Sequence, residues 1–144
     1  MHNTDSRPAK LLIVDDDPVV RERVAVYLED SGFAVQEAED GFQGLELLRS
    51  SRPDVLLLDL RMPGMDGLDV LAEVNREARD IPVIVITGVG VLQDAVSAIR
   101  HGAYDFVTKP ITDMTVLEHS VTNALNQARL KEENNAYRFH LEQE

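Results

Sequence analysis

The chain has 144 residues, a formal net charge of −12 and no cysteine. The length suits one compact domain with a short remainder, and the lack of cysteine excludes disulfides and thiolate metal sites. The acidic balance excludes nucleic-acid binding through a broad positive surface. No apolar run approaches the roughly 18–20 residues that span a bilayer. We therefore expect a cytoplasmic protein that contacts neither a membrane nor nucleic acid directly.

Five short apolar segments predict five β-strands. Their sequences are KLLIVD, FAVQEA, DVLLLD, PVIVIT and DFVTK, at residues 10–15, 33–38, 54–59, 82–87 and 105–109. Three of them are nearly continuous runs of Val, Ile and Leu. Such runs are typical of strands that are buried on both faces of a parallel sheet.

The segments between the strands have the apolar spacing of helices. The residues that mark the first four helices are Val20, Val24 and Leu28; Leu45 and Leu48; Leu68, Leu71 and Val74; and Leu92, Val96 and Ile99. Asp17-Pro18 predicts an N-cap followed by proline at the first helical position. Ser31-Gly32 and Gly102 predict the ends of the first and fourth helices. A fifth helix should begin near Thr112-Asp113 and bury Leu117, Val121, Ala124 and Leu125.

Strand and helix alternate five times, which predicts an α/β fold with a doubly wound, five-stranded parallel sheet flanked by five helices. Ligands of such sheets bind beyond the carboxyl ends of the strands. Polar residues stand at four of these ends, namely Asp15-Asp16, Asp59, Thr87 and Lys109. The sequence therefore predicts a site that combines carboxylates, a hydroxyl and an ammonium group at one edge of the sheet.

A cluster of carboxylates provides the hard oxygen ligands that Mg²⁺ prefers. Asp15, Asp16 and Asp59 together carry three negative charges, which one Mg²⁺ and Lys109 would neutralise. Without the metal, repulsion should raise the pKa of at least one carboxyl group. A carboxylate can also attack phosphorus to give an aspartyl phosphate, with a metal, a lysine and a hydroxyl stabilising the transferred group.

These motifs resemble the CheY-like receiver domain of bacterial two-component response regulators. The matching stretches are LLIVDDDP, DVLLLDLRMPGMDG, VIVITG and GAYDFVTKP, which follow the family order and spacing across residues 9–128. The resemblance implies the flavodoxin-like strand order 2-1-3-4-5. It also implies that the glycine-rich turn at residues 62–67 shapes the acceptor site.

By position, the resemblance implies that Asp59 is the phosphoacceptor. It implies that Asp15, Asp16, Asp59 and the main-chain carbonyl of Arg61 hold Mg²⁺, for which Mn²⁺ can substitute. Asp17 lies outside this acidic pair, and helix capping is its expected role.

The remaining site residues are assigned in the same way. Thr87 and Phe106 would form the switch pair, and Lys109 would contact the phosphoryl group and precede a cis bond to Pro110. A second interpretation of Phe106, as an ordinary core residue, remains open.

The resemblance implies a phosphoacceptor switch, not a conventional enzyme, that catalyses only its own phosphoryl transfer and slow autodephosphorylation. The expected donor is a sensor histidine kinase or phosphotransfer protein. Phosphorylation would change the surface of the fourth helix, fifth strand and fifth helix. Two alternatives are a phosphorylation-independent pseudo-receiver and a Mg²⁺-dependent phosphohydrolase, although a hydrolase usually has a second aspartate where this chain has Arg61.

We expect three parts in the chain: a flexible N-terminus at residues 1–8, a receiver domain at 9–128, and a helical linker at 129–144 that extends the fifth helix towards an output domain of a longer protein. Neither proline nor glycine occurs after Ile111. Leu130, Asn134, Tyr137 and Leu141 follow the 4-3-4 spacing of a coiled-coil seam, which predicts a homodimer. The alternative is a solvated helix end.

Overall fold

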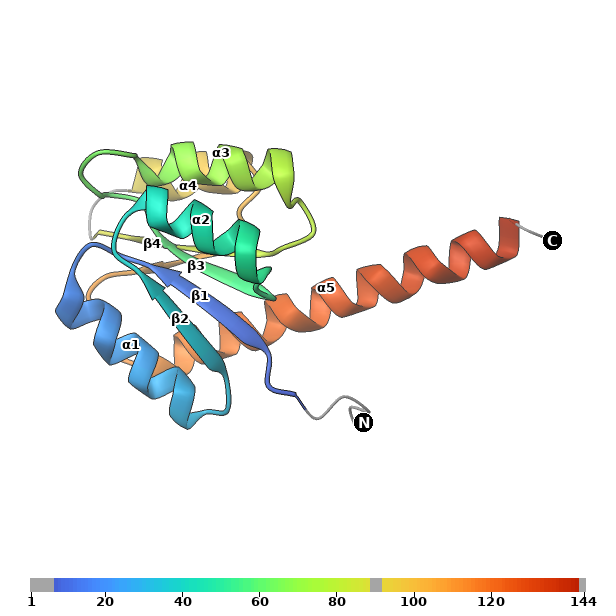
Figure 1. Ribbon diagram of the computed structural model, residues 1–144, viewed down its shortest axis with the longest axis horizontal. Coiled ribbons are helices and arrows are strands. Elements are labelled where there is room, and N and C mark those ends of the chain that lie inside the picture. Colours follow the sequence, from blue (N-terminus) through green and yellow to red (C-terminus); the bar gives the residue numbers. More distant parts are fainter. Residues whose placement is uncertain (1–6, 89–91, 143–144) are drawn as a thin grey trace.

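The computed structural model describes residues 7–88 and 92–142, with side chains up to residue 133. Strands and helices alternate along the chain, as Figure 1 shows. The strands are β1 (Lys10–Val14), β2 (Ala34–Ala38), β3 (Val55–Asp59), β4 (Val83–Thr87) and β5 (Asp105–Thr108). The helices are α1 (Pro18–Asp30), α2 (Gly41–Ser51), α3 (Gly67–Glu77), α4 (Leu92–Arg100) and α5 (Met114–Glu142).

The strands form one parallel sheet in the order β2-β1-β3-β4-β5, which confirms the predicted fold class and strand order. Each strand lies within one residue of its predicted limits. Every residue of β3 and β4 is buried, whereas β2, at an edge of the sheet, is mostly exposed or half-buried. The continuous apolar runs therefore correspond to the strands that helices cover on both faces.

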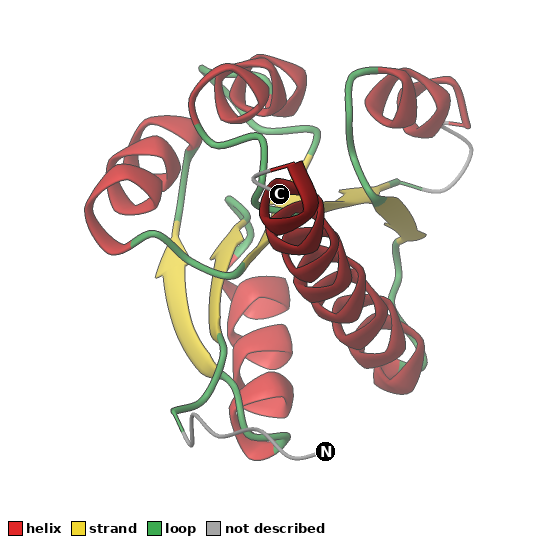
Figure 2. Cartoon of the chain, turned by 90° about the vertical axis from the view of Figure 1, so that its right-hand side faces the viewer, coloured by secondary structure: helices red, strands yellow, loops and turns green. Residues whose placement is uncertain are grey.

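Two apolar clusters lie on opposite faces of the sheet. One joins alternate residues of the strands to α2, α3 and α4, and includes Leu45, Leu71 and Ala98. The other joins the remaining strand residues to α1 and α5, and includes Leu28 and Leu117. Figure 2 shows the helices on both sides of the sheet, with the C-terminal end of α5 towards the viewer. This arrangement leaves the carboxyl edge of the sheet to the strand-end loops.

The predicted signals at the helix ends are confirmed. Asp17 caps α1 by accepting hydrogen bonds from the N–H groups of Val19 and Val20, with Pro18 as the first helical residue. Gly32 and Gly102 have φ angles of 104° and 103° and follow α1 and α4. At both ends two backbone N–H groups bond back to the last turn, which is the Schellman arrangement that favours glycine.

The fourth helix lies where it was predicted, but the residues that marked it do not face the core. Leu92, Val96 and Ile99 are exposed, and Leu92 retains 69% of its accessible surface. The residues that α4 buries are Ala95 and Ala98. The helix therefore packs on the sheet through its small side chains, and its larger apolar side chains face outwards.

Helix α5 begins one residue after Asp113, whose carboxylate accepts a hydrogen bond from Thr115 N–H at 3.0 Å. As predicted, Leu117, Val121 and Ala124 are buried, and Leu125 is partly buried. The buried hydroxyl of Ser120 also donates to Asp105 Oδ2 at 2.7 Å, which fastens the helix to β5.

Beyond the sheet, α5 continues without interruption and projects from the domain (Figure 1). Leu130, the first residue of the predicted coiled-coil seam, is half exposed. Asn134, Tyr137 and Leu141 lie outside the residues whose side chains are described, so the seam and the domain boundary at residue 129 remain predictions. Within the described parts of the chain, no helix combines the length and apolarity required to cross a membrane.

Candidate metal centre

Four strand ends bring the candidate residues to one edge of the sheet. Asp15 directly follows β1, Asp59 ends β3, Thr87 ends β4, and Lys109 directly follows β5. The parallel register places these ends side by side, with Asp59 next to Ile86 and Thr87 next to Thr108. The site predicted from strand ends is therefore assembled by the topology of the sheet.

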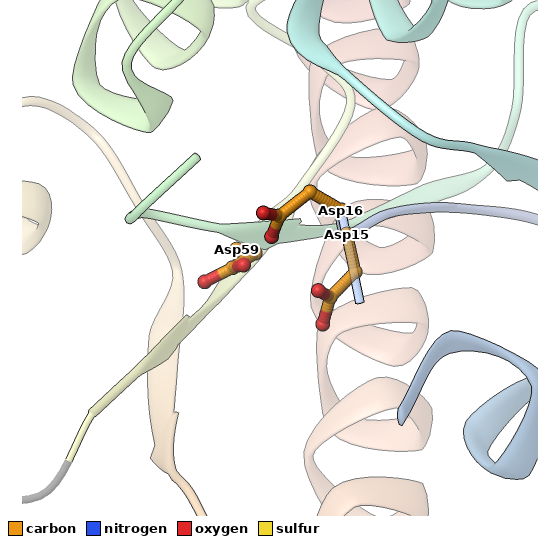
Figure 3. A group of neighbouring side chains, drawn as sticks. All are labelled: Asp15, Asp16 and Asp59. Carbon is orange, nitrogen blue, oxygen red and sulfur yellow. The ribbon is translucent and has the colours of Figure 1, made fainter. Parts of the chain in front are cut away.

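Three carboxylates form the centre of the site. One oxygen from each of Asp15, Asp16 and Asp59 lies within 4.8 Å of the others, and Figure 3 shows them grouped at the ends of β1 and β3. Asp15 is completely buried and Asp59 is 3% exposed, whereas Asp16 is exposed. Two buried carboxylates beside an exposed one can bind a cation that keeps part of its hydration shell.

The ammonium group of Lys109 lies between the two buried carboxylates. Its Nζ is 3.3 Å from Asp15 Oδ2 and 3.4 Å from Asp59 Oδ2. Burial acts to lower the pKa of Lys109, but the charges of Asp59 and Asp15 outweigh it and hold that pKa above its usual value. Lys109 therefore remains a cation and supplies one of the positive charges that the site needs.

Asp59 has the most strongly altered carboxyl group of the site. Burial, and secondly the charge of Asp15, raise its pKa from 3.8 to about 7. Lys109 and the N–H of Arg61, which is 3.3 Å from Asp59 Oδ1, act in the opposite direction. The expectation that one carboxyl pKa rises without metal is thus confirmed, with desolvation a larger cause than the repulsion on which the expectation rested.

One buried oxygen indicates what would complete the site. Asp15 Oδ1 accepts a hydrogen bond from Asp17 N–H at 2.9 Å, whereas Asp15 Oδ2 is buried without a hydrogen-bond partner and is ion-paired with Lys109 Nζ at 3.3 Å. A buried carboxylate oxygen that accepts no hydrogen bond is costly, and a divalent cation held with Asp16 and Asp59 would give this oxygen a second partner beside Lys109. The donor set consists of oxygens alone and therefore fits Mg²⁺.

The two predicted switch residues have opposite environments. Thr87 is 2% exposed, and its carbonyl accepts a hydrogen bond from Lys109 N–H at 2.7 Å. Phe106 is 37% exposed on β5, so in this structure it does not fill the core. The cis bond expected between Lys109 and Pro110 is present.

Three contacts close to the site were not predicted from the sequence. Arg21 bonds to the main chain at Asp15. The guanidinium group of Arg61 pairs with Asp94 on α4, with 2.6 Å between Nε and Oδ2. Gly67 packs against the backbone of Asp59 and Leu60. Only Gly67 carried a signal, as the last residue of the glycine-rich turn after β3.

Comparison with known proteins agrees with this geometry. The family model described as "Response regulator receiver domain" matches residues 11–122. The chain is 38% identical over 122 residues to the transcriptional regulatory protein GlrR of Escherichia coli K12, covering 85% of this chain and 27% of that protein. It is 39% identical over 132 residues to the C4-dicarboxylate transport transcriptional regulatory protein DctD of Pseudomonas aeruginosa, covering 92% and 28%.

Solved structures agree as well. NtrX from Brucella abortus, in complex with ADP, superposes with a TM-score of 0.86 at 36% identity, over 89% of this chain and 29% of that one. A response regulator receiver domain protein from Clostridium thermocellum superposes with a TM-score of 0.81 at 31% identity, over 85% and 98%. The chain thus spans about a quarter of the length of GlrR and DctD. It belongs to the family of response regulator receiver domains.

Proposed function

We propose that this chain is a cytoplasmic phosphoacceptor switch, in which Asp59 receives a phosphoryl group from a sensor histidine kinase or a phosphotransfer protein. One observation carries the proposal: a buried carboxylate, Asp59, lies 3.4 Å from the Lys109 ammonium and beside Asp15, whose Oδ2 is buried and accepts no hydrogen bond. A nucleophile, a fixed cation and carboxylates that can hold a divalent cation are what phosphoryl transfer to aspartate requires.

In this proposal Asp59, Asp15 and Asp16, with the main-chain carbonyl of Arg61, would hold Mg²⁺, and Mn²⁺ could substitute. The metal would supply neutralisation of negative charge on the transferred group. An oxygen of Asp59 attacks phosphorus, the bond from phosphorus to the donor breaks, and the donor leaves with that electron pair. Lys109 holds its proton at Nζ and binds a phosphoryl oxygen. Autodephosphorylation by water reverses the modification, and no other turnover is proposed.

The response would be a shift between two arrangements of the site. The phosphoryl group adds negative charge and acceptor oxygens, to which the hydroxyl of Thr87 can donate once it turns inwards. Phe106, now exposed, would then fill the space that Thr87 leaves. This movement would change the surface formed by α4, β5 and α5, where Leu92, Val96 and Ile99 are exposed.

The names of two relatives support a proposal about the partner that this switch controls. GlrR and DctD bear the names of transcriptional regulatory proteins, and the chain covers 27% and 28% of them. We therefore propose that α5 leads to an output domain that the phosphorylated receiver controls. We propose that this domain itself contacts neither nucleic acid nor a membrane directly.

The test is phosphorylation by acetyl phosphate with Mg²⁺. The product is analysed by intact-mass measurement and by its lability in base. The chain should gain one phosphoryl group with the lability of an acyl phosphate, and Asp59→Asn should gain none. Asp54→Asn, directly before the first residue of β3, is the control and should be labelled like the wild type. Full labelling of Asp59→Asn would contradict the acceptor assignment.

This experiment, together with a second assay of p-nitrophenyl phosphate turnover, separates the alternatives. An unlabelled wild type would favour the phosphorylation-independent pseudo-receiver, and turnover of p-nitrophenyl phosphate would favour a phosphohydrolase. The second acid of such a hydrolase is missing, because Arg61 occupies its position and pairs with Asp94.

A further inference from the structure

Arg21, in the first turn of α1, links three elements beside the metal centre. Its Nη1 donates to the main-chain carbonyl of Asp15 at 2.7 Å, and its Nε donates to Glu37 Oε1 on β2 at 3.0 Å. The side chain of Arg21 is only 17% exposed. The planar guanidinium group makes both bonds at once, which fixes it in direction as well as in position.

The carbonyl that Arg21 binds belongs to the peptide group between Asp15 and Asp16. Because that group is planar and trans, a bond that fixes the oxygen also fixes the N–H and Cα of Asp16. The preceding peptide group is fixed as well, since Asp15 N–H donates to Ala38 O at 3.1 Å. The backbone of both acidic residues is therefore held from two sides, by β2 and by Arg21.

Asp16 depends on this support more than Asp15 does. The carboxylate of Asp15 is buried and accepts a hydrogen bond from Asp17 N–H. That of Asp16 is exposed, so packing restrains it less and its direction depends on its backbone. A ligand of this kind is effective only when the surrounding groups orient it.

The charge of Arg21 cannot be what helps a cation to bind. A guanidinium group beside the acidic cluster would repel Mg²⁺. Glu37 pairs with Arg21 at 3.0 Å and offsets that charge. The pair therefore provides a hydrogen-bond donor to the Asp15 carbonyl while adding no net positive charge at the site.

We infer that Arg21, oriented by Glu37, is a positioning residue for the divalent cation, which sets metal affinity by fixing the peptide group between Asp15 and Asp16. The inference rests on the proposed function only in that the acidic cluster binds Mg²⁺. It assigns Arg21 no contact with the metal or with the phosphoryl group.

The test is titration of the unphosphorylated protein with MgCl₂. Binding is monitored through the amide chemical shifts of Asp16 and Asp59. Arg21→Met keeps the apolar stem and removes both donors, and should weaken Mg²⁺ binding about tenfold, the low end for groups that orient metal ligands. Arg21→Lys should be intermediate, because one ammonium cannot replace the two-pronged contact. In metal-free protein, Arg21→Met should also shift the Asp16 amide resonance.

Arg49→Met is the matched control. Arg49 bonds to Glu77 between α2 and α3 at 2.8 and 2.6 Å, and its loss should leave Mg²⁺ affinity unchanged. Glu37→Gln should weaken binding less than Arg21→Met does, and should add nothing in the Arg21→Met background, as expected for two residues that act as a unit.

The outcomes are distinct. Tighter Mg²⁺ binding by Arg21→Met would show that its charge dominates and would overturn the inference. A lower melting temperature with unchanged affinity would overturn it as well, because the role would then be structural only. Absence of Mg²⁺ binding in the wild type would instead refute the proposed metal site.

Discussion

Gly67 packs so closely against Asp59 that a Cβ on the glycine would lie 2.6 Å from the Asp59 carbonyl oxygen. The same Cβ would lie 2.5 Å from Leu60 Cα. Gly67 N–H also donates to Leu60 O at 3.0 Å. The start of α3 therefore rests directly on the backbone of the proposed acceptor, and the glycine is required there by space.

Gly67→Ala should consequently disturb both the fold and the site. Since both close atoms belong to the backbone, relief requires movement of the loop, and we expect a loss of about 1–3 kcal/mol in the free energy of unfolding together with weaker Mg²⁺ binding. Gly64→Ala is the control: Gly64 has φ of 82°, and a Cβ there would meet no atom within 4 Å other than those of its chain neighbours. That change should cost about 1 kcal/mol of backbone strain and leave Mg²⁺ affinity unaltered. Urea unfolding and Mg²⁺ titration of both variants provide the comparison.

The raised pKa of Asp59 predicts a specific pH dependence. Between about pH 4 and 7 the metal-free folded protein keeps a proton on Asp59 that the unfolded chain has released. Rising pH therefore lowers the free energy of unfolding across this range, and the loss attributable to Asp59 is complete above about pH 7. Mg²⁺ competes with that proton, so its affinity should rise over the same range.

The measurement is the difference in urea midpoint between wild type and Asp59→Asn from pH 5 to 8, with and without Mg²⁺. The difference removes the contributions of other groups, such as Glu77, whose pKa is lowered to about 2 by Arg49 and Glu73. Without metal the wild type should lose stability relative to the variant as the pH rises, and Mg²⁺ should restore it. A pH-independent difference would contradict a raised pKa.

Substitutions of the adjacent aspartates should have different effects, because these residues have different roles. Asp16→Ala should weaken Mg²⁺ binding strongly, because it removes one of three carboxylates from a site of about millimolar affinity. Asp17→Ala should mainly cost about 1 kcal/mol of stability, because Asp17 caps α1. Isothermal titration and thermal unfolding measure the two effects. Loss of Mg²⁺ binding in Asp17→Ala, with Asp16→Ala unaffected, would show that the metal-ligand assignment is shifted by one residue.

Lys109→Met should destabilise the metal-free protein, because two buried carboxylates lose the cation that lies 3.3 and 3.4 Å away. We expect on the order of 2 kcal/mol at pH 8, below the value typical of fully buried pairs, and less at pH 6, where Asp59 can hold a proton. Lys10→Met, at the other end of the sheet, is the control.

Phosphorylation should persist in part in Lys109→Ala, while the chemical-shift response to beryllofluoride diminishes. An unaltered response would remove Lys109 from the switch.

The predicted coiled-coil seam beyond residue 129 can be tested by shortening the chain. If Leu130 and the residues that continue its spacing form a dimer, the full chain should sediment as a dimer at high micromolar concentration and a chain ending at Arg129 as a monomer. The comparison is made with and without beryllofluoride, because the α4, β5 and α5 surface offers a second contact. If the full chain and the shortened chain are both monomers under every condition, the extension of α5 is only a linker.

The amino-acid sequence by itself determined the fold and the edge of the sheet that carries the site. The alternation of buried strands with helical spacing specifies a parallel doubly wound sheet, and in such a sheet the residues that follow each strand must meet at one edge. Asp15, Asp59, Thr87 and Lys109 could therefore be placed together before any distance was known. The caps at Asp17, Gly32 and Gly102 were equally predictable, since they depend on a few neighbouring residues.

Tertiary structure alone decided the properties that depend on packing between distant segments. Leu92, Val96 and Ile99 have helical spacing, but the sheet receives Ala95 and Ala98, because the space between α4 and the sheet determines which face fits. The pKa of Asp59 depends on how completely its neighbours exclude water. The contacts of Arg21 with Asp15 and Glu37 join α1, the end of β1 and β2. No local pattern encodes such a contact, because it forms only when all three elements have taken their places.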